Sequence, residues 1–301
     1  MKQFLKLLVI FIAPILIIGG AIEVLLRQIP NDYKQKAAYL SSNANTIETL
    51  ILGSSHSLYG INPDYLKGNA FNASFVSQTP DVDWAILQQY QNQLTNLKTI
   101  IIRLSYASLF ETLSETNEAW RLKDYNLYFH LQQDYTFKQH SELLSVKLQN
   151  NLNRIYNYYV LGVSETSITQ SGWGINAHVT PPENLEQAGI NVAQRHTISD
   201  LSQYHFNTDN FKAIAAFCET RNIQLVVITL PGYKSYNSYM DKTQWQKTED
   251  FGKFLDSTYT TCTYLNFLND ESFTAQDFFD GDHLNAQGAK KLSVKLQELL
   301  K

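Results

Sequence analysis

The sequence predicts an α/β fold, a three-layer, flavodoxin-like sandwich with a central parallel sheet, preceded by an N-terminal transmembrane helix. Two patterns predict the sandwich. Short β-branched runs, at residues 99–104 and 224–230, have the continuous apolar character of strands covered on both faces. Segments with helical apolar spacing separate these runs, and such alternation favours parallel strands joined by right-handed crossovers.

The N-terminal segment has the length and composition of a membrane span. Residues 4–26 are almost entirely apolar, and a helix of that length crosses a hydrocarbon core of about 30 Å. Lys2 and Lys6 precede most of the run, which predicts a cytoplasmic N-terminus and an exported remainder. A cleaved signal peptide, with Gly19 and Ala21 before the cut, is the alternative. The apolar run continues past that point and favours an uncleaved anchor.

The sequence predicts three parts: an anchor with its flank at 1–28, a polar stalk at 29–46 and an α/β domain at 47–301. The strands expected in the domain are 49–52, 70–73, 99–104, 224–230 and 263–268. The expected helices that cover them are 83–94, 210–220, 242–255 and 286–300. Residues at about 111–200 form an insertion, which is mostly helical at first and then polar and irregular.

Composition excludes several functions. The net charge is −4 without a basic run, which argues against nucleic acid as a partner. The sequence has neither a glycine-rich phosphate loop nor a Cys/His cluster with metal-ligand spacing, so we predict no cofactor and no metal.

Cys218, near a helix end, and Cys262, before a strand, should lie at one edge of the sheet. An exported domain permits a disulfide there, and two separate buried thiols are the alternative.

Two polar segments carry the groups of a nucleophilic site. The first strand runs into Gly53-Ser54-Ser55-His56, and Asp280-Gly281-Asp282-His283 precedes the last helix. A serine is a poor nucleophile near neutral pH unless an imidazole takes its proton and a carboxylate orients that imidazole. Because parallel sheets bind ligands at the carboxyl ends of their strands, both segments should meet at that rim.

These segments predict a catalytic triad. Ser55 is expected to attack an ester carbonyl, with His283 as the base and Asp280 orienting His283. Asp282 is the competing carboxylate, but it is adjacent to His283 in sequence and should reach the ring less well. His56 is a second candidate base, for which we favour a role at the rim or in contact with substrate.

The two segments resemble the catalytic blocks of the SGNH (GDSL-type) hydrolases. Gly53-Ser54-Ser55 is similar to their Gly-Asp-Ser block, with Ser54 in place of the usual aspartate, and residues 280–285 are similar to their final Asp-x-x-His block. The longer strings 52–63 and 280–288 resemble a membrane-anchored bacterial branch of the superfamily. The resemblance implies an acyl-enzyme mechanism.

The resemblance also implies an oxyanion hole. Its first donor would be the backbone N–H of Ser55. Ser74 stands at the position of the second-block glycine, and Ser105 stands where the third block normally supplies an asparagine. The missing asparagine places the oxyanion hole in question.

The function implied is that of a serine esterase or O-acyltransferase, which handles a small acyl group such as acetyl on an exported cell-envelope or capsular glycan. A membrane-bound acyl donor would be a natural partner. The rim and insertion loops offer candidate glycan contacts at Trp173, Arg195, His196, Tyr233 and Tyr236. The alternative is a non-catalytic glycan-binding or scaffold subunit of a polysaccharide assembly complex, an idea that the missing asparagine favours.

Overall fold

The computed structural model describes residues 1–131, 136–175 and 184–300. The chain forms two compact units. The helical unit comprises Met1–Ala38 and Ala119–Thr166, and the sheet unit comprises Tyr39–Glu118 and Ser167–Lys301. Parts of the predicted insertion, residues 132–135 and 176–183, lie outside the described residues.

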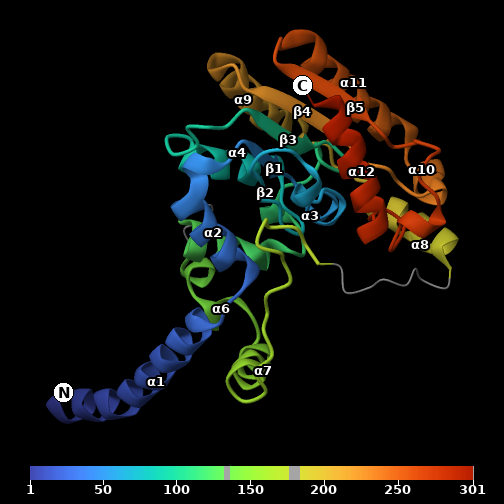
Figure 1. Ribbon diagram of the computed structural model, residues 1–301. Helices are drawn as coiled ribbons and strands as arrows, with labels where there is room; N and C mark the ends of the chain where they lie inside the picture. Colours follow the sequence, from blue (N-terminus) through green and yellow to red (C-terminus); the bar gives the residue numbers. More distant parts are fainter. Residues whose placement is uncertain (132–135, 176–183, 301) are drawn as a thin grey trace. The chain divides into compact units, whose positions relative to one another are not determined.

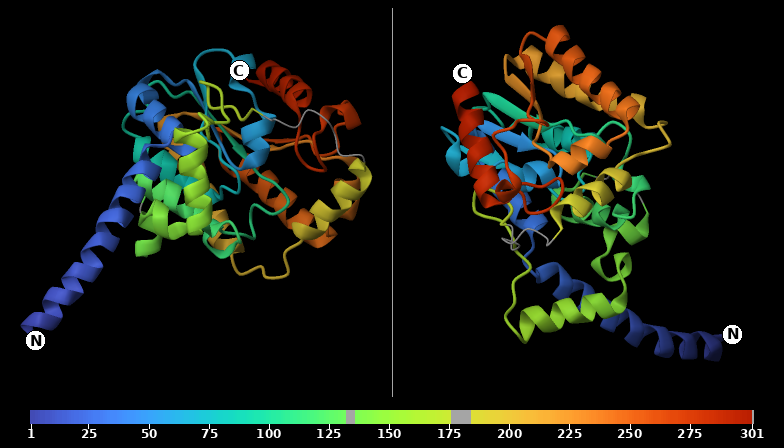
Figure 2. Two further views of the ribbon diagram at one scale, coloured as in Figure 1. Left: turned by 90° about the horizontal axis from the view of Figure 1, so that it is seen from below. Right: turned by 90° about the vertical axis from the view of Figure 1, so that its right-hand side faces the viewer.

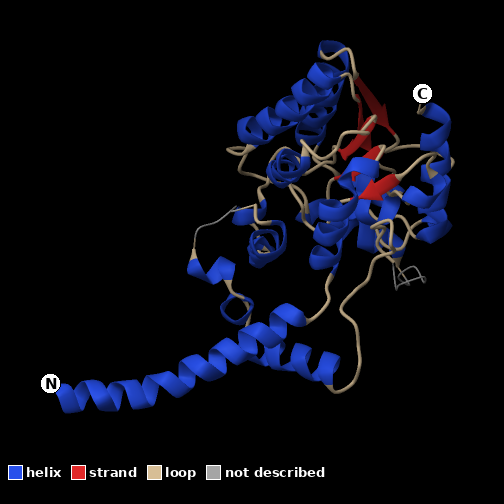
Figure 3. Cartoon of the chain, turned by 60° about the vertical axis from the view of Figure 1, so that its left-hand side comes forward, coloured by secondary structure: helices blue, strands red, loops and turns tan. Residues whose placement is uncertain are grey.

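The sheet unit is built on five parallel strands in the order β2-β1-β3-β4-β5 (Figure 1). Their bounds are β1 Thr49–Leu52, β2 Ala70–Asn72, β3 Thr99–Arg103, β4 Gln224–Thr229 and β5 Cys262–Asn266. The strands lie between layers of helices (Figures 2 and 3). The predicted α/β fold with a central parallel sheet is therefore confirmed, and each predicted strand occurs within a few residues of its expected bounds.

Helices cover both faces of the sheet, which explains why its central strands are mostly apolar. The helices of this unit are α3 Ser55–Gly60, α4 Pro80–Tyr90, α8 Leu185–Arg195, α9 Tyr204–Arg221, α10 Lys234–Tyr239, α11 Lys242–Thr258 and α12 Ala286–Leu299. Helix α4 packs against α9 on one side, and α12 packs against α3. Leu50, Ile101 and Val227 are completely or almost completely buried as a result. Removing this apolar surface from water supplies the main driving force for folding.

The helical unit contains α1 Lys2–Gln28, α5 Leu122–Asp124, α6 Glu142–Ser145 and α7 Leu148–Tyr159, with a π-helical turn at Tyr125–Phe129. Helix α1 is long and apolar enough to cross a membrane, and a signal sequence would meet the same criteria. A buried ion network holds the other helices, because Glu142 lies 3.0 Å from Lys123 and 2.8 Å from Arg154. A cavity of about 990 Å³ lies within this unit.

Helix α2 spans Asp32–Asn43, inside the segment that the sequence assigned to a stalk. Its composition is polar, but it presents Ala37 and Leu40 to the protein interior, where both are buried. The few apolar residues were too sparse to reveal a helix by periodicity. Much of this segment is therefore ordered helix.

The disulfide prediction is wrong. Cys218, near the end of α9, and Cys262, at the start of β5, are free and buried thiols. Burial raises the pKa of both groups, that of Cys262 to about 12. The two positions do lie at element ends, as expected, but the thiols fill the core as small apolar side chains.

Candidate active site

A sharp turn at the end of β1 presents Ser55. Gly53 has φ 119°, and an added Cβ would lie 2.9 Å from both Arg103 Cβ and Ser57 Oγ, so a side chain would be strained there. The Gly53 N–H donates to the buried carboxylate of Asp83 at 2.8 Å. Burial raises the pKa of Asp83 to about 7. The turn thus fixes the start of α3, whose first residue is Ser55.

The predicted convergence of the three triad side chains is confirmed. Ser55 Oγ lies 2.7 Å from His283 Nε2, although the two residues are 228 positions apart. His283 Nδ1 lies 3.0 Å from each carboxylate oxygen of Asp280. Asp280 also accepts the backbone N–H groups of Asp282 and His283, at 3.0 and 2.8 Å. The serine, the imidazole and a carboxylate therefore form one chain of contacts.

Asp282 is better placed than the sequence suggested. Its Oδ1 lies 3.2 Å from His283 Nδ1, so the expectation that sequence adjacency would keep it away from the ring is wrong. The reason is the tight turn closed by Asp280, which brings both carboxylates to the same nitrogen. The Asp282 side chain is fully buried, whereas that of Asp280 is 29% exposed. Water screens a buried charge much less, so Asp282 is the stronger electrostatic partner.

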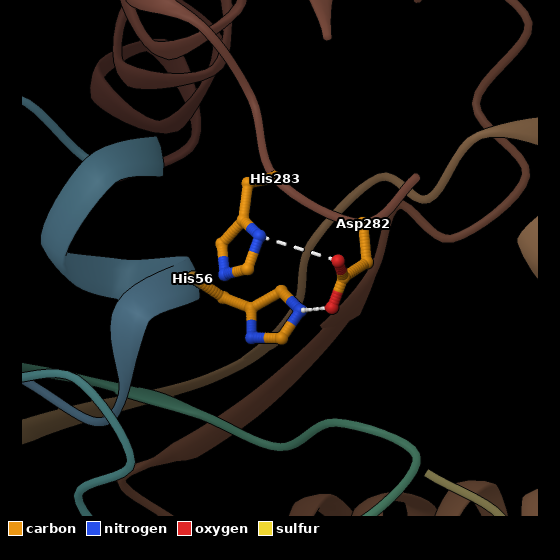
Figure 4. Close-up of side chains that lie close together, drawn as sticks. All are labelled: His56, Asp282 and His283. Carbon is orange, nitrogen blue, oxygen red and sulfur yellow. Dashed lines mark ion pairs between the residues drawn. The ribbon is translucent and has the colours of Figure 1, made fainter. Parts of the chain in front are cut away.

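His56 is an interior residue of the site, so the predicted position at the rim is wrong, whereas the alternative of a substrate contact stays a prediction. Its Nε2 lies 3.0 Å from Asp282 Oδ2, and its ring stacks on that of His283 with centroids 4.7 Å apart. Figure 4 shows the Asp282 carboxylate facing one nitrogen of each imidazole. Arg103 Nη1 lies 3.4 Å from His56 Nδ1. Because a guanidinium only donates, this contact leaves the imidazole proton on Nε2, directed at Asp282.

The electrostatic surroundings give the two histidines different pKa values. Burial lowers the pKa of His56 to about 4, so this ring is neutral at physiological pH. Burial opposes the charging of His283 as well, but the adjacent Asp282 and Asp280 carboxylates raise its pKa to about 10. Burial alone would raise the pKa of Asp282, yet His283 and His56 hold it well below its usual range. The site therefore holds a buried ion pair between His283 and Asp282 that faces the serine.

The predicted oxyanion donors differ in their availability. Ser55 occupies the first position of α3, where backbone N–H groups have no acceptor within the helix. The Ser74 N–H donates to Asn72 Oδ1 at 3.0 Å, and the Ser105 N–H donates to Ser108 Oγ at 2.8 Å. Ser105 Oγ in turn accepts from the guanidinium of Arg103. The Ser74 N–H is therefore already engaged, in contrast to the prediction. The Ser105 hydroxyl, which would replace the asparagine, contacts Arg103 and lies 3.1 Å from Ser108 Oγ.

Arg103 is a site residue that the sequence analysis missed. It is buried at the end of β3, it contacts both His56 and Ser105, and its Nε has no hydrogen-bond acceptor among the described residues. A cavity of about 10 Å³, roughly the space for one water, adjoins these groups. The cavity lining includes Tyr236 and Asp282. The available signal was a lone charged residue closing the apolar run of β3.

The predicted glycan contacts fall into two groups. Tyr236 is buried, with its hydroxyl 3.3 Å from His196 Nδ1, so it is not an exposed stacking surface as predicted. His196 Nδ1 lies 3.7 Å from Asp282 and thus belongs to the same cluster. The other three residues lie at least partly at the surface: Tyr233 against Phe278, Trp173 donating to the carbonyl of Tyr59 at 2.8 Å, and Arg195 exposed.

A metal is a weaker explanation of this cluster than an ion pair. The ligand atoms of His56, Asp282 and His283 lie within 4.8 Å of one another. However, the two imidazole nitrogens that face Asp282 lie 3.0 and 3.2 Å from its oxygens, which is ion-pair distance, although neither oxygen accepts a hydrogen bond from the described residues. The Arg103 contact further places a proton, rather than a free lone pair, on the facing nitrogen of His56.

Comparison with known proteins adds one partial match. The model of an uncharacterised protein family matches residues 188–301. This region contains Asp280, Asp282 and His283 but not Ser55. No curated protein matches the sequence.

Proposed function

We propose that this protein is a serine esterase or O-acyltransferase of the SGNH type. The contact between Ser55 Oγ and His283 Nε2, at 2.7 Å, carries the proposal. The opposite nitrogen of His283 faces two carboxylates at 3.0 and 3.2 Å. This is the order of groups that activates a serine hydroxyl for acyl transfer.

The chemistry follows from these positions. Neutral His283 accepts the Ser55 proton while Oγ adds to the ester carbonyl, and the Ser55 N–H donates to the developing oxyanion. Collapse of the tetrahedral intermediate breaks the ester C–O bond, and His283 returns the proton to the leaving oxygen. The acyl group remains on Ser55 Oγ. Water or a sugar hydroxyl then attacks this acyl-enzyme and loses its proton to His283. The bond between the acyl carbon and Ser55 Oγ breaks, and His283 returns the proton to Oγ.

The proposed setting is the outer side of a cytoplasmic membrane. Helix α1 would remain as an uncleaved anchor, and Lys2 and Lys6 favour a cytoplasmic N-terminus. The substrate class that meets an enzyme there is a cell-envelope or capsular glycan, with a membrane-bound protein as a candidate acyl donor. The surface aromatic side chains of Tyr233 and Trp173 suit contact with sugar rings.

A specific observation favours a second candidate, a non-catalytic glycan-binding or scaffold subunit. The backbone N–H groups of Ser74 and Ser105 both donate to neighbouring side chains, and the asparagine expected at Ser105 is absent. An acyl-transfer site with one oxyanion donor would lose several kcal/mol of transition-state stabilisation. A scaffold would have no turnover of any ester.

A chain-length assay tests the proposed function. We expect the purified full-length protein to turn over acetyl esters at least about tenfold faster than long-chain esters, since a narrow pocket excludes extra methylenes. Rates on acetyl, butyryl and palmitoyl esters would be measured with and without an oligosaccharide acceptor. Acetyl transfer to the sugar with little free acetate would identify a transferase. Faster turnover of palmitoyl esters would contradict the proposal, and inertness toward all esters would favour the scaffold.

A further inference from the structure

Helix α7 carries an apolar face that the protein leaves in contact with solvent. Leu148, Leu152, Tyr156 and Tyr159 are 53%, 43%, 53% and 44% exposed. Their spacing places them on one side of the helix. A helix of a water-soluble domain normally turns such a face toward the core. Contiguous exposed apolar surface of this kind marks an interaction site.

The exposed surface of α7 has a second, polar side. Gln149, Asn153 and Asn157 are exposed, and Gln149 Nε2 donates to Asn153 Oδ1 at 3.0 Å. Leu152 and Asn157 lie roughly 140° apart around the helix axis. The buried Asn151, on a third side, donates to the carbonyl oxygens of Glu142 and Leu143 at 3.1 Å and fastens the helix to its own unit. The rotation of α7 is thus fixed, with the apolar and polar sides both facing outward.

Helix α7 lies beside the end of the candidate membrane span. The hydroxyl of Tyr159 donates to the backbone carbonyl of Leu25 at 3.0 Å. Both residues belong to the helical unit, in which α1 and α7 are drawn in blue and yellow-green in Figure 2. Leu25 is three residues from the last residue of α1, so this bond sets the C-terminal end of α7 at the edge of the apolar segment.

The start of the α6–α7 segment is attached to α1 two residues before Leu25, at Glu23. The carboxylate of Glu23 accepts the hydroxyl of Ser141 at 2.9 Å and the backbone N–H groups of Glu142 and Leu143 at 3.1 and 2.8 Å. Together with Arg27, whose Nε lies 2.6 Å from Glu23 Oε1, these donors compensate the one acidic side chain of a mostly apolar helix, which matters most where water is scarce. Both ends of the segment are therefore held against the last turns of α1.

We propose that α7 lies in the plane of the membrane interface as a second lipid contact beside the anchor. Its Leu148, Leu152, Tyr156 and Tyr159 face meets lipid, and its Gln149, Asn153 and Asn157 side meets water and headgroups. With 12 residues it is too short to span a bilayer but suited to lie on one. Tyrosine side chains favour this boundary because the ring is apolar and the hydroxyl is polar.

Lipid is a better partner for the apolar face of α7 than a second copy of the chain, because α7 is attached to the helix that would cross the membrane. The apolar face of α7 meets α1 at its C-terminal end, where Tyr159 contacts Leu25, and the apolar residues farther along α1, such as Ile15, Leu16 and Ile17, are 56%, 68% and 71% exposed. The bilayer that covers α1 therefore reaches α7. The inference rests on the proposed role of α1 as a retained anchor, and it is independent of the acyl chemistry.

Spin labelling of the full chain in liposomes tests the inference. Single cysteines would replace Leu152 and, as the matched control on the same helix, Asn157. The native Cys218 and Cys262 are buried and should not react. We expect the nitroxide at position 152 to collide mainly with lipid-soluble oxygen and the nitroxide at 157 mainly with a water-soluble nickel complex. Because both sites are exposed, neither label should disturb folding.

A third label, replacing Ile17 in α1, distinguishes a failure of the membrane anchor from a failure of the interfacial position of α7. Oxygen access at 17 with nickel access at 152 would overturn the interfacial position of α7 while keeping the anchor. Shielding of 152 from both reagents would indicate a protein partner and would also overturn it. Loss of residue 17 from the mature chain, with nickel access at 152, would remove both the anchor and the interfacial helix.

Discussion

Replacing Ser55 with alanine is expected to lower ester turnover by roughly four to six orders of magnitude. The substitution removes Ser55 Oγ, which lies 2.7 Å from His283 Nε2 and would accept the acyl group. The side chain is small and lies at the first position of α3, so the fold should persist. Turnover of an acetyl ester and the thermal unfolding midpoint would be measured together.

Ser54→Ala is the matched control for this experiment. Ser54 occupies the same turn, and its hydroxyl lies 3.3 Å from His56 Nδ1, away from the proposed reaction. Its loss should reduce turnover far less than the loss of Ser55. Equal effects of the two substitutions, or residual turnover near the wild-type rate in Ser55→Ala, would contradict the role of Ser55.

Replacing Asp282 with asparagine should lower turnover by roughly three to four orders of magnitude, more than Asp280→Asn does. Both carboxylates face His283 Nδ1, but Asp282 is fully buried and also holds His56. An amide at position 282 removes the buried charge that stabilises the imidazolium. It also removes the negative charge that lies 3.0 Å from His56 Nε2. The two variants would be compared by kcat and KM for the same ester.

The pH dependence of kcat/KM identifies which carboxylate is the principal partner of His283, independently of the absolute rate. Neutral His283 is the proton acceptor, and because the carboxylates raise its pKa to about 10, activity should rise with pH well above the usual histidine range. Removing a negative charge lowers that pKa. The acid limb of kcat/KM should therefore move to lower pH in both variants, and farther in Asp282→Asn. A larger shift in Asp280→Asn would make Asp280 the principal partner.

The sheet and the triad contacts could be predicted because local signals specify them. The β-branched runs gave the strands, and parallel order brought Ser55 and His283 to one rim. The side-chain contacts that surround the triad could not be predicted. The position of Asp282 depends on a turn closed by Asp280, and that of His56, in α3, depends on a contact with Arg103 from β3. Such contacts follow from tertiary packing rather than from spacing.

Exposure was the other quantity that the sequence could not supply. Tyr236 follows a strand, as a rim residue should, but it packs inward beside Tyr106. The spacing of Leu148, Leu152 and Tyr156 is visible in the sequence and would suit a core-facing helix equally well. Only the structure shows that this face is uncovered and adjoins α1.

The central claim is that Ser55 is an activated nucleophile, and covalent labelling tests it most directly. The full-length protein would be treated with a fluorophosphonate, and the modified peptide would be identified by mass spectrometry. We predict a single adduct on Ser55 Oγ, formed faster as pH rises and absent in His283→Ala. Intact, folded protein that stays unlabelled, or labelling at another serine with Ser55 unmodified, would contradict the account.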